Sequence, residues 1–263
     1  MEFQEFGEEN SKTLVLMPGT CCTWKINFGR VIDALQKQYH LICVNYDGFD
    51  GTGSTFPDML TVTEKIEDYI IENHQGTVDG AYGSSLGGSF VGLLIQRKRI
   101  HINHGFIGSS DLDQTGKFVG KIQATIISNL LYRASKSERG KKRLINALKK
   151  GIHMEDTSGM EEMMSDLTMG ISHLKKETVY NQFYSDLITP LEDQIDVNDT
   201  IVHVIYALKM GEKYEERYLK HFKNLDIHRL DMQHEAWMFD KEWEEPVLDV
   251  INECMEMHVK QQV

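Results

Sequence analysis

A serine flanked by glycines constrains the fold of this chain more than any other feature. Gly83, Ser85 and Gly87 follow an apolar run at 78–82 that predicts a strand, and they precede a predicted helix from about Ser89. A sharp turn between strand and helix needs glycines where a Cβ would collide with neighbouring backbone. Such a turn presents a serine hydroxyl as a nucleophile at the carboxyl end of a strand. The alternative interpretation is a glycine-rich turn whose serine caps the helix.

Strand-like and helix-like segments alternate along much of the chain. Parallel strands need crossover connections that pack on a face of the sheet, so this alternation predicts an α/β fold with a doubly wound, mostly parallel sheet. The predicted strands are 12–17, 39–46, 78–82, 101–108, 201–208 and 225–230, and a helix closes the chain.

A long segment in the second half of the chain has helical periodicity only. One apolar stripe consists of Phe118, Ile122, Ile126 and Leu130 at helical spacing. We therefore expect a core formed by residues 1–112 and 199–263, with a helical lid inserted at 113–198.

Charge and cysteine content exclude several classes of protein. The formal net charge of −12 would repel a nucleic-acid backbone or an anionic membrane, and no apolar stretch approaches the ~20 residues that span a bilayer. No secretory leader is recognisable, and the four cysteines form no spaced framework. We expect a cytoplasmic protein that acts on a small molecule, with no nucleic-acid or membrane partner; a homodimer is compatible with the sequence.

In these features the sequence resembles the α/β-hydrolase family over nearly its whole length. Residues 47–54 are similar to the family's Asp-x-x-Gly-x-Gly-x-Ser loop, with one extra residue before the first glycine. Pro18 and Gly19 stand where the family usually has His-Gly, so the turn is retained and the histidine is not. The resemblance implies that the N–H of Thr20 or Cys21 donates to an oxyanion. The N–H of Leu86, at the start of the helix, is the other expected donor.

His234 is the predicted general base. It lies a few residues beyond the last predicted strand, which matches the family's position for the catalytic histidine. A histidine can act as base and then as acid near neutral pH; the alternative is a hydrogen-bonded loop residue. His101 and His104 would lie on opposite faces of a strand, and His228 is interpreted as a core histidine. No metal site and no cofactor are predicted.

The sequence leaves two candidates for the acid of a catalytic triad. The family commonly takes it from the loop after its seventh strand, where Glu212 is the first carboxylate. Some members take it from the end of the sixth strand, where this chain has Asp111. Both residues preserve the order nucleophile, acid, histidine, and geometry rather than sequence position defines a triad.

These residues predict a carboxylesterase-like serine hydrolase (EC 3.1) that cleaves an ester-like bond of a small, partly apolar substrate through an acyl-enzyme. Two alternatives stay open. C–C hydrolases, lyases and perhydrolases use the same fold and site, and a non-catalytic ligand-binding protein could retain both. A thiol nucleophile at Cys21 or Cys22 is less favoured, because these residues lie in a different loop from Ser85.

Overall fold

The central element is a seven-stranded sheet with strand order β1-β3-β2-β4-β5-β6-β7. The computed structural model describes residues 1–112, 114–149 and 158–257, so residue 113, at one boundary of the predicted lid, lies outside the described residues. The strands are β1 (Glu2–Phe6), β2 (Thr13–Met17), β3 (His40–Asn45), β4 (Thr77–Ser84), β5 (His101–Gly108), β6 (Ile201–Ala207) and β7 (Leu225–Leu230). The six predicted strands are all present, and the predicted doubly wound, mostly parallel sheet is confirmed.

Strand β1 was not expected from the sequence. It pairs antiparallel with β3, from Glu2 opposite Asn45 to Phe6 opposite Leu41. The other strands pair in parallel. At this edge of the sheet the strand is largely half-buried or exposed, and two of its five residues are glutamates. It therefore lacks the apolar run by which buried strands are recognised.

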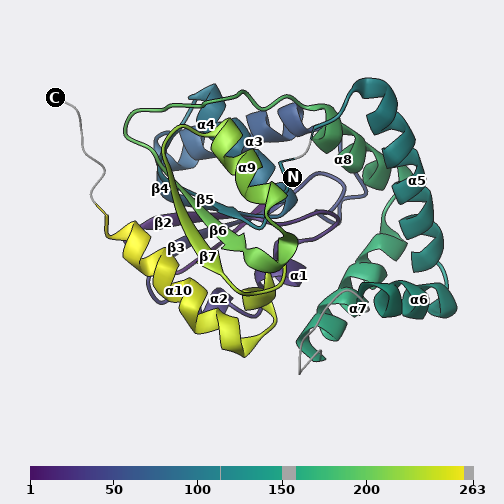
Figure 1. Ribbon diagram of the computed structural model, residues 1–263. Coiled ribbons are helices and arrows are strands. Elements are labelled where there is room, and N and C mark those ends of the chain that lie inside the picture. Colours follow the sequence, from purple (N-terminus) through teal and green to yellow (C-terminus); the bar gives the residue numbers. More distant parts are fainter. Residues whose placement is uncertain (113, 150–157, 258–263) are drawn as a thin grey trace.

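Helices cover both faces of the sheet (Figure 1). One apolar layer includes residues of α3 and α4, and the other includes residues of α1, α2 and α10. The helices outside the inserted block are α1 (Trp24–Phe28), α2 (Ile32–Leu35), α3 (Met59–His74), α4 (Leu86–Arg97), α9 (Lys213–His221) and α10 (Lys241–Met255). None of the helices in the described ranges is both long and apolar enough to cross a membrane.

Among the described residues, four helices lie between β5 and β6 in the chain, beside the sheet in Figure 1. They are α5 (Lys117–Ser135), α6 (Glu138–Lys149), α7 (Ser158–His173) and α8 (Lys176–Ile188). The predicted stripe on α5 faces solvent: Phe118 is 78 % exposed and Leu130 is 64 % exposed. The role of this helical block as a lid stays a prediction.

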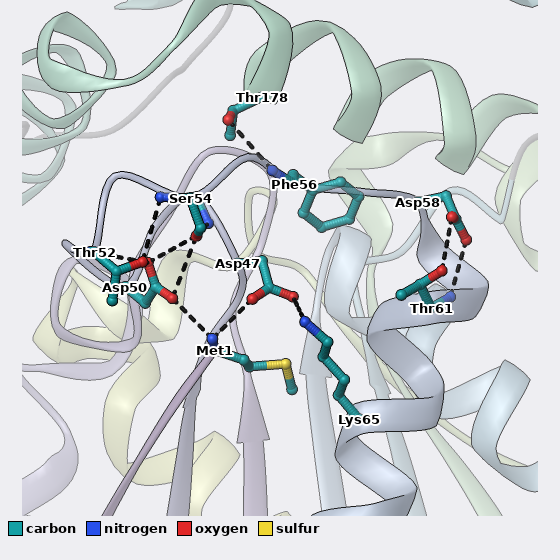
Figure 2. Close-up of polar contacts among 11 residues, drawn as sticks. Met1, Asp47, Asp50, Thr52, Ser54, Phe56, Asp58, Thr61, Lys65 and Thr178 are labelled. Carbon is teal, nitrogen blue, oxygen red and sulfur yellow. Dashed lines mark hydrogen bonds and ion pairs between the residues drawn. The ribbon is translucent and has the colours of Figure 1, made fainter.

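Helix α8 is hydrogen-bonded to the loop following β3 through the backbone of Phe56. Its N–H donates to Thr178 Oγ1 at 3.3 Å (Figure 2), and its carbonyl accepts from Asn181 Nδ2 at 2.8 Å. These bonds join the helical block to the sheet domain near the carboxyl end of β3.

The loop at 47–54 is organised by two carboxylates (Figure 2). Asp50 accepts hydrogen bonds from the N–H of Thr52 at 3.1 Å and from the hydroxyl of Ser54 at 3.2 Å. The Met1 ammonium lies 2.8 Å from both Asp47 and Asp50. Burial opposes ionisation, but the hydrogen bonds from Met1 and Thr52 lower the pKa of Asp50 to about 2. The loop is thus held by an ionised carboxylate.

Candidate active site

Ser85 lies at the turn between β4 and α4. Its backbone has φ 51° and ψ −114°, a conformation that non-glycine residues rarely adopt. Its N–H donates to the carbonyl of Gly108, at the end of β5, at 2.8 Å. Strained residues of this kind cost about 1–3 kcal/mol and persist only where the surroundings enforce the geometry. The side chain is half-buried, while the neighbouring residues Ser84 and Leu86 are buried.

The two flanking glycines are required by the backbone around this turn. A Cβ on Gly83 would lie 2.1 Å from the carbonyl carbon and oxygen of Gly87. A Cβ on Gly87 would lie 2.1 Å from the carbonyl oxygen of Met17, the last residue of β2. Backbone atoms that belong to rigid strands and helices cannot move away cheaply. The glycine spacing in the sequence therefore follows from contact between three backbone segments.

The loop that carries the predicted second oxyanion donor lies against the turn. A Cβ on Gly19 would be 3.4 Å from the Cβ of Ser85. The N–H of Gly19 donates to Asn27 Oδ1 at 2.6 Å, and the hydroxyl of Tyr46 donates to the carbonyl of Pro18 at 2.9 Å. These bonds fix the loop beside Ser85. Among the described residues, the N–H groups of the predicted donors Leu86 and Thr20 have no hydrogen-bond acceptor.

The third predicted donor, the N–H of Cys21, already has an acceptor. It donates to Oε1 of Gln182, on α8, at 2.8 Å. Gln182 is fully buried, and its Nε2 has no hydrogen-bond partner among the described residues. An unpaired buried amide costs about 1–3 kcal/mol. Sequence reasoning missed this residue, because nothing in the pattern of α8 indicates that Gln182 reaches a loop 161 residues away.

The thiols of Cys21 and Cys22 are poorly suited to nucleophilic attack. Both residues are buried, and burial raises the pKa of Cys22 to about 12 and that of Cys21 still further. Only the thiolate is strongly nucleophilic, so both groups are unreactive near neutral pH.

His234 lies in the loop that follows β7. Two bonds place this loop beside the carboxyl ends of other strands: the N–H of Glu235 donates to Ser109 Oγ at 3.2 Å, and the N–H of Lys209 donates to the carbonyl of Met232 at 3.3 Å. His234 is exposed, yet desolvation by the protein atoms crowded around the imidazole lowers its pKa. The imidazole is therefore neutral at pH 7, as a general base must be.

The two acid candidates lie on the segments that contact the histidine loop. Asp111 follows Ser109 and Ser110, and its carbonyl accepts from Arg217 Nη1 at 3.0 Å. Glu212 precedes α9 and is exposed. In the described part of the chain, no hydrogen bond joins either carboxylate to His234. The choice between Glu212 and Asp111 therefore stays open.

Glu235 is a buried carboxyl group next to the histidine that sequence reasoning did not single out. Its Oε2 accepts from the Tyr82 hydroxyl at 3.0 Å and from Trp237 Nε1 at 3.1 Å. Burial raises the pKa of Glu235 to about 7, and the hydrogen bonds from Tyr82 and Trp237 offset this only in part. A Cβ on Gly108 would lie 2.6 Å from Glu235 Oε1, so this carboxyl lies close to the strand end that holds Ser85.

A cavity of about 330 Å³ lies beside the Cys21 loop. Part of its wall comes from the loop at 47–54 and part from α7 and the turn that follows it. The lining residues are Cys21, Thr23, Ile26, Gly48, Phe49, Gly51, Gly53, Ser54, Gly170, His173, Leu174 and Lys175. The sheet domain and the helical block thus both contribute to one cavity near the predicted oxyanion donors.

The raised pKa of Glu235 predicts a pH-dependent stability. The folded state keeps the proton up to about pH 7, whereas the unfolded chain loses it near 4.5, so this group destabilises the fold as pH rises between these values. Glu235→Gln should therefore be more stable relative to the native protein at pH 8 than at pH 5, and this difference in unfolding free energy should grow by about 2–3 kcal/mol between the two pH values. Urea denaturation of both proteins at pH 5 and at pH 8 measures the difference. Glu216→Gln, at an exposed position, controls for the charge change; equal differences at both pH values would refute the prediction.

Comparisons with known proteins identify the fold. No protein-family model and no curated protein sequence matches the chain. An α/β hydrolase family protein from Desulfitobacterium hafniense is 17% identical with a TM-score of 0.69, over 97% of this chain and 100% of that chain. A thermophilic esterase from Thermogutta terrifontis is 13% identical with a TM-score of 0.72 (97% and 93% covered). The enol-lactonase from Burkholderia xenovorans is 14% identical with a TM-score of 0.70 (97% and 96% covered). The chain therefore has the α/β-hydrolase fold that its sequence resembles.

Proposed function

We propose that this chain is a serine hydrolase that cleaves an ester-like bond, with Ser85 as nucleophile and His234 as general base. The observation that carries the proposal is the backbone of Ser85. Its strained conformation is enforced by three backbone segments, and strain of this kind clusters at active sites. The structures with a similar fold include an esterase and an enol-lactonase, which supports hydrolase chemistry.

In the proposed mechanism, Ser85 Oγ attacks the carbonyl carbon of the substrate while His234 accepts the hydroxyl proton. The negative charge on the carbonyl oxygen is stabilised by the N–H of Leu86 and by that of Thr20 or Cys21. Collapse of this intermediate expels the alcohol, which takes the proton from His234, and leaves an acyl group on Ser85. A water molecule then attacks the acyl group while His234 accepts its proton, and the acid product leaves as the proton returns to Ser85. Glu212 or Asp111 would orient the imidazole.

The cavity beside Cys21 is the proposed binding site for one part of the substrate. Its walls combine apolar side chains, such as Phe49 and Leu174, with backbone of the glycine-rich loop. A volume of about 330 Å³ suits a small ligand. Because α7 and the turn after it line this cavity, we propose that the helical block from 113 to 198 acts as a lid that shapes the pocket.

A ligand-binding protein without catalysis is the second candidate, and one observation favours it. The carboxamide oxygen of Gln182 accepts the hydrogen bond of the Cys21 N–H, to which the substrate oxyanion would bind. If Cys21 is a required donor, the substrate must displace Gln182 before reaction. A test of serine reactivity separates the two candidates.

The first test is labelling of the native chain with a fluorophosphonate, which reacts with activated serines. We expect stoichiometric labelling of Ser85, because the mechanism requires an activated hydroxyl at that position. Ser85→Ala should abolish labelling and lower ester turnover by about 10⁴-fold or more without unfolding the protein. His234→Gln should slow labelling strongly. Labelling at another residue, or undiminished turnover in Ser85→Ala, would contradict the proposed nucleophile; an unlabelled native chain would favour the binding protein.

A second test separates the two acid candidates by amide replacement. The carboxylate that orients His234 also stabilises the imidazolium, so its loss should cost about 10³- to 10⁴-fold in turnover. We expect this loss for Glu212→Gln or for Asp111→Asn, but not for both. Glu216→Gln, on the same helix start as Glu212, serves as the matched control. Near-full activity in both variants would indicate a Ser85–His234 dyad.

A third test asks whether Gln182 competes with substrate. Gln182→Leu removes the acceptor at Cys21 while nearly preserving side-chain volume. One neutral hydrogen bond contributes about 0.5–1.5 kcal/mol, so the second-order rate of fluorophosphonate labelling should rise roughly 2- to 10-fold. Gln182→Glu keeps an acceptor and adds a negative charge near the developing oxyanion, and it should slow labelling. A slower reaction of Gln182→Leu would instead mean that Gln182 holds the Cys21 loop in its reactive position.

A further inference from the structure

Four side chains of metal-binding type lie together, away from Ser85. We call them the edge cluster: His203, Asp226, His228 and Cys254. One ligand atom of each lies within 4.8 Å of the others. They come from the first four residues of β6 and β7 and from α10, whereas Ser85 follows the carboxyl end of β4. The edge cluster is therefore separate from the proposed active site, and it is not needed for the chemistry proposed there.

Three distances within the edge cluster are close to those of a tetrahedral metal site. Asp226 Oδ2 lies 3.0 Å from His203 Nδ1 and 2.9 Å from His228 Nε2. Cys254 Sγ lies 3.4 Å from His228 Nε2. Zinc bonds of about 2.0–2.3 Å at tetrahedral angles separate neighbouring ligand atoms by roughly 3.3–3.6 Å. Shifts of a few tenths of an ångström would open these three contacts to accept the ion.

The second ring nitrogen of His203 has a partner outside the cluster. His104 Nδ1 lies 3.1 Å from His203 Nε2, and both residues are buried. Histidines that bind a metal through one ring nitrogen usually form a hydrogen bond through the other, which fixes the orientation of the ring.

The first ring nitrogen of His203 faces Asp226. His203 Nδ1 lies 3.0 Å from Asp226 Oδ2, and the side chain of His203 is fully buried. A metal ion bound by both atoms would take the place of this direct contact.

We propose that the edge cluster binds a structural zinc ion that ties α10 to strands β6 and β7. Two imidazoles, one carboxylate and one thiolate provide four ligands, which leaves no open position for catalysis. The mixture of nitrogen and sulfur ligands favours zinc over magnesium or calcium. Zinc with one carboxylate and one thiolate has no net charge, which limits the cost of burying the site. Asp226, whose side chain is 39 % exposed, provides access from solvent.

Zinc binding requires the loss of one proton from the cluster. A cysteine thiol that binds no metal keeps its proton near neutral pH. In the proposed reaction the zinc ion replaces this proton on Sγ, a Zn–S bond forms, and the proton is released to solvent. No electron transfer takes place.

The experiment uses the full chain, stripped with a chelator and dialysed. Titration with zinc against a chromophoric chelator should give one equivalent bound. Zinc at a hundredfold excess over its Kd should raise the Tm by roughly 5–10 °C. Cobalt(II) in place of zinc should give the intense visible bands of tetrahedral cobalt and a thiolate charge-transfer band in the near ultraviolet.

Matched variants distinguish the edge cluster from adventitious binding. Asp226→Asn and Cys254→Ser should each weaken zinc binding more than about 100-fold, and Cys254→Ser should lose the charge-transfer band. Cys43→Ser, at another buried free cysteine, should keep both. If the wild-type chain binds no stoichiometric zinc, or if Asp226→Asn and Cys254→Ser bind as tightly as Cys43→Ser, the four residues form only a hydrogen-bond network and the proposal is wrong. The proposed hydrolase activity would stand in either case.

Discussion

The packing of backbone against backbone around Ser85 is the constraint on which the candidate site depends. The turn at Ser85 brings the start of α4 so close to the end of β2 that a single methyl group at Gly87 would lie 2.1 Å from Met17. Side chains can repack around an altered neighbour, but backbone that belongs to a sheet ladder cannot. The strained conformation of Ser85 is therefore maintained by the sheet itself, and the same contact keeps the loop after β2 against the serine.

The loops at the carboxyl end of the sheet are connected mainly by hydrogen bonds between distant segments. Ser109 joins the end of β5 to the histidine loop, and Lys209 joins the end of β6 to the same loop. Gln182 joins α8 to the loop after β2. Loops carry binding and catalytic residues while the strands provide rigidity. Here the helical block contributes a buried amide as well, so pocket and helices are coupled.

Buried polar groups distinguish the two ends of the sheet. At the carboxyl end, burial raises the pKa of Glu235 to about 7, and the hydrogen bonds that its carboxyl group accepts offset this only in part. Toward the amino ends of β6 and β7, the buried His203 and the half-buried His228 lie beside a carboxylate and a thiol. Unpaired or repulsive polar groups are costly inside proteins, and they persist where function or a ligand requires them. In the described part of this chain, one such group, the unpaired Nε2 of Gln182, occurs next to the candidate site.

Local sequence is sufficient to predict the turn at Ser85, the strands from β2 to β7 and a doubly wound, mostly parallel sheet, because glycine spacing and apolar runs are properties of neighbouring residues. The α/β-hydrolase fold is expected from a family resemblance. The sequence also suggests Ser85 and His234 as candidates through that resemblance. The half-exposed strand β1 has no such pattern. Only the tertiary structure decides that Gln182 accepts a hydrogen bond from Cys21 and that Glu235 accepts one from Tyr82. It also brings Cys254 Sγ within 4.8 Å of the histidines of β6 and β7. These contacts depend on strand register and on how the helices pack against the sheet. Both arise from the packing of segments that are in part more than a hundred residues apart, so no local sequence pattern predicts the contacts.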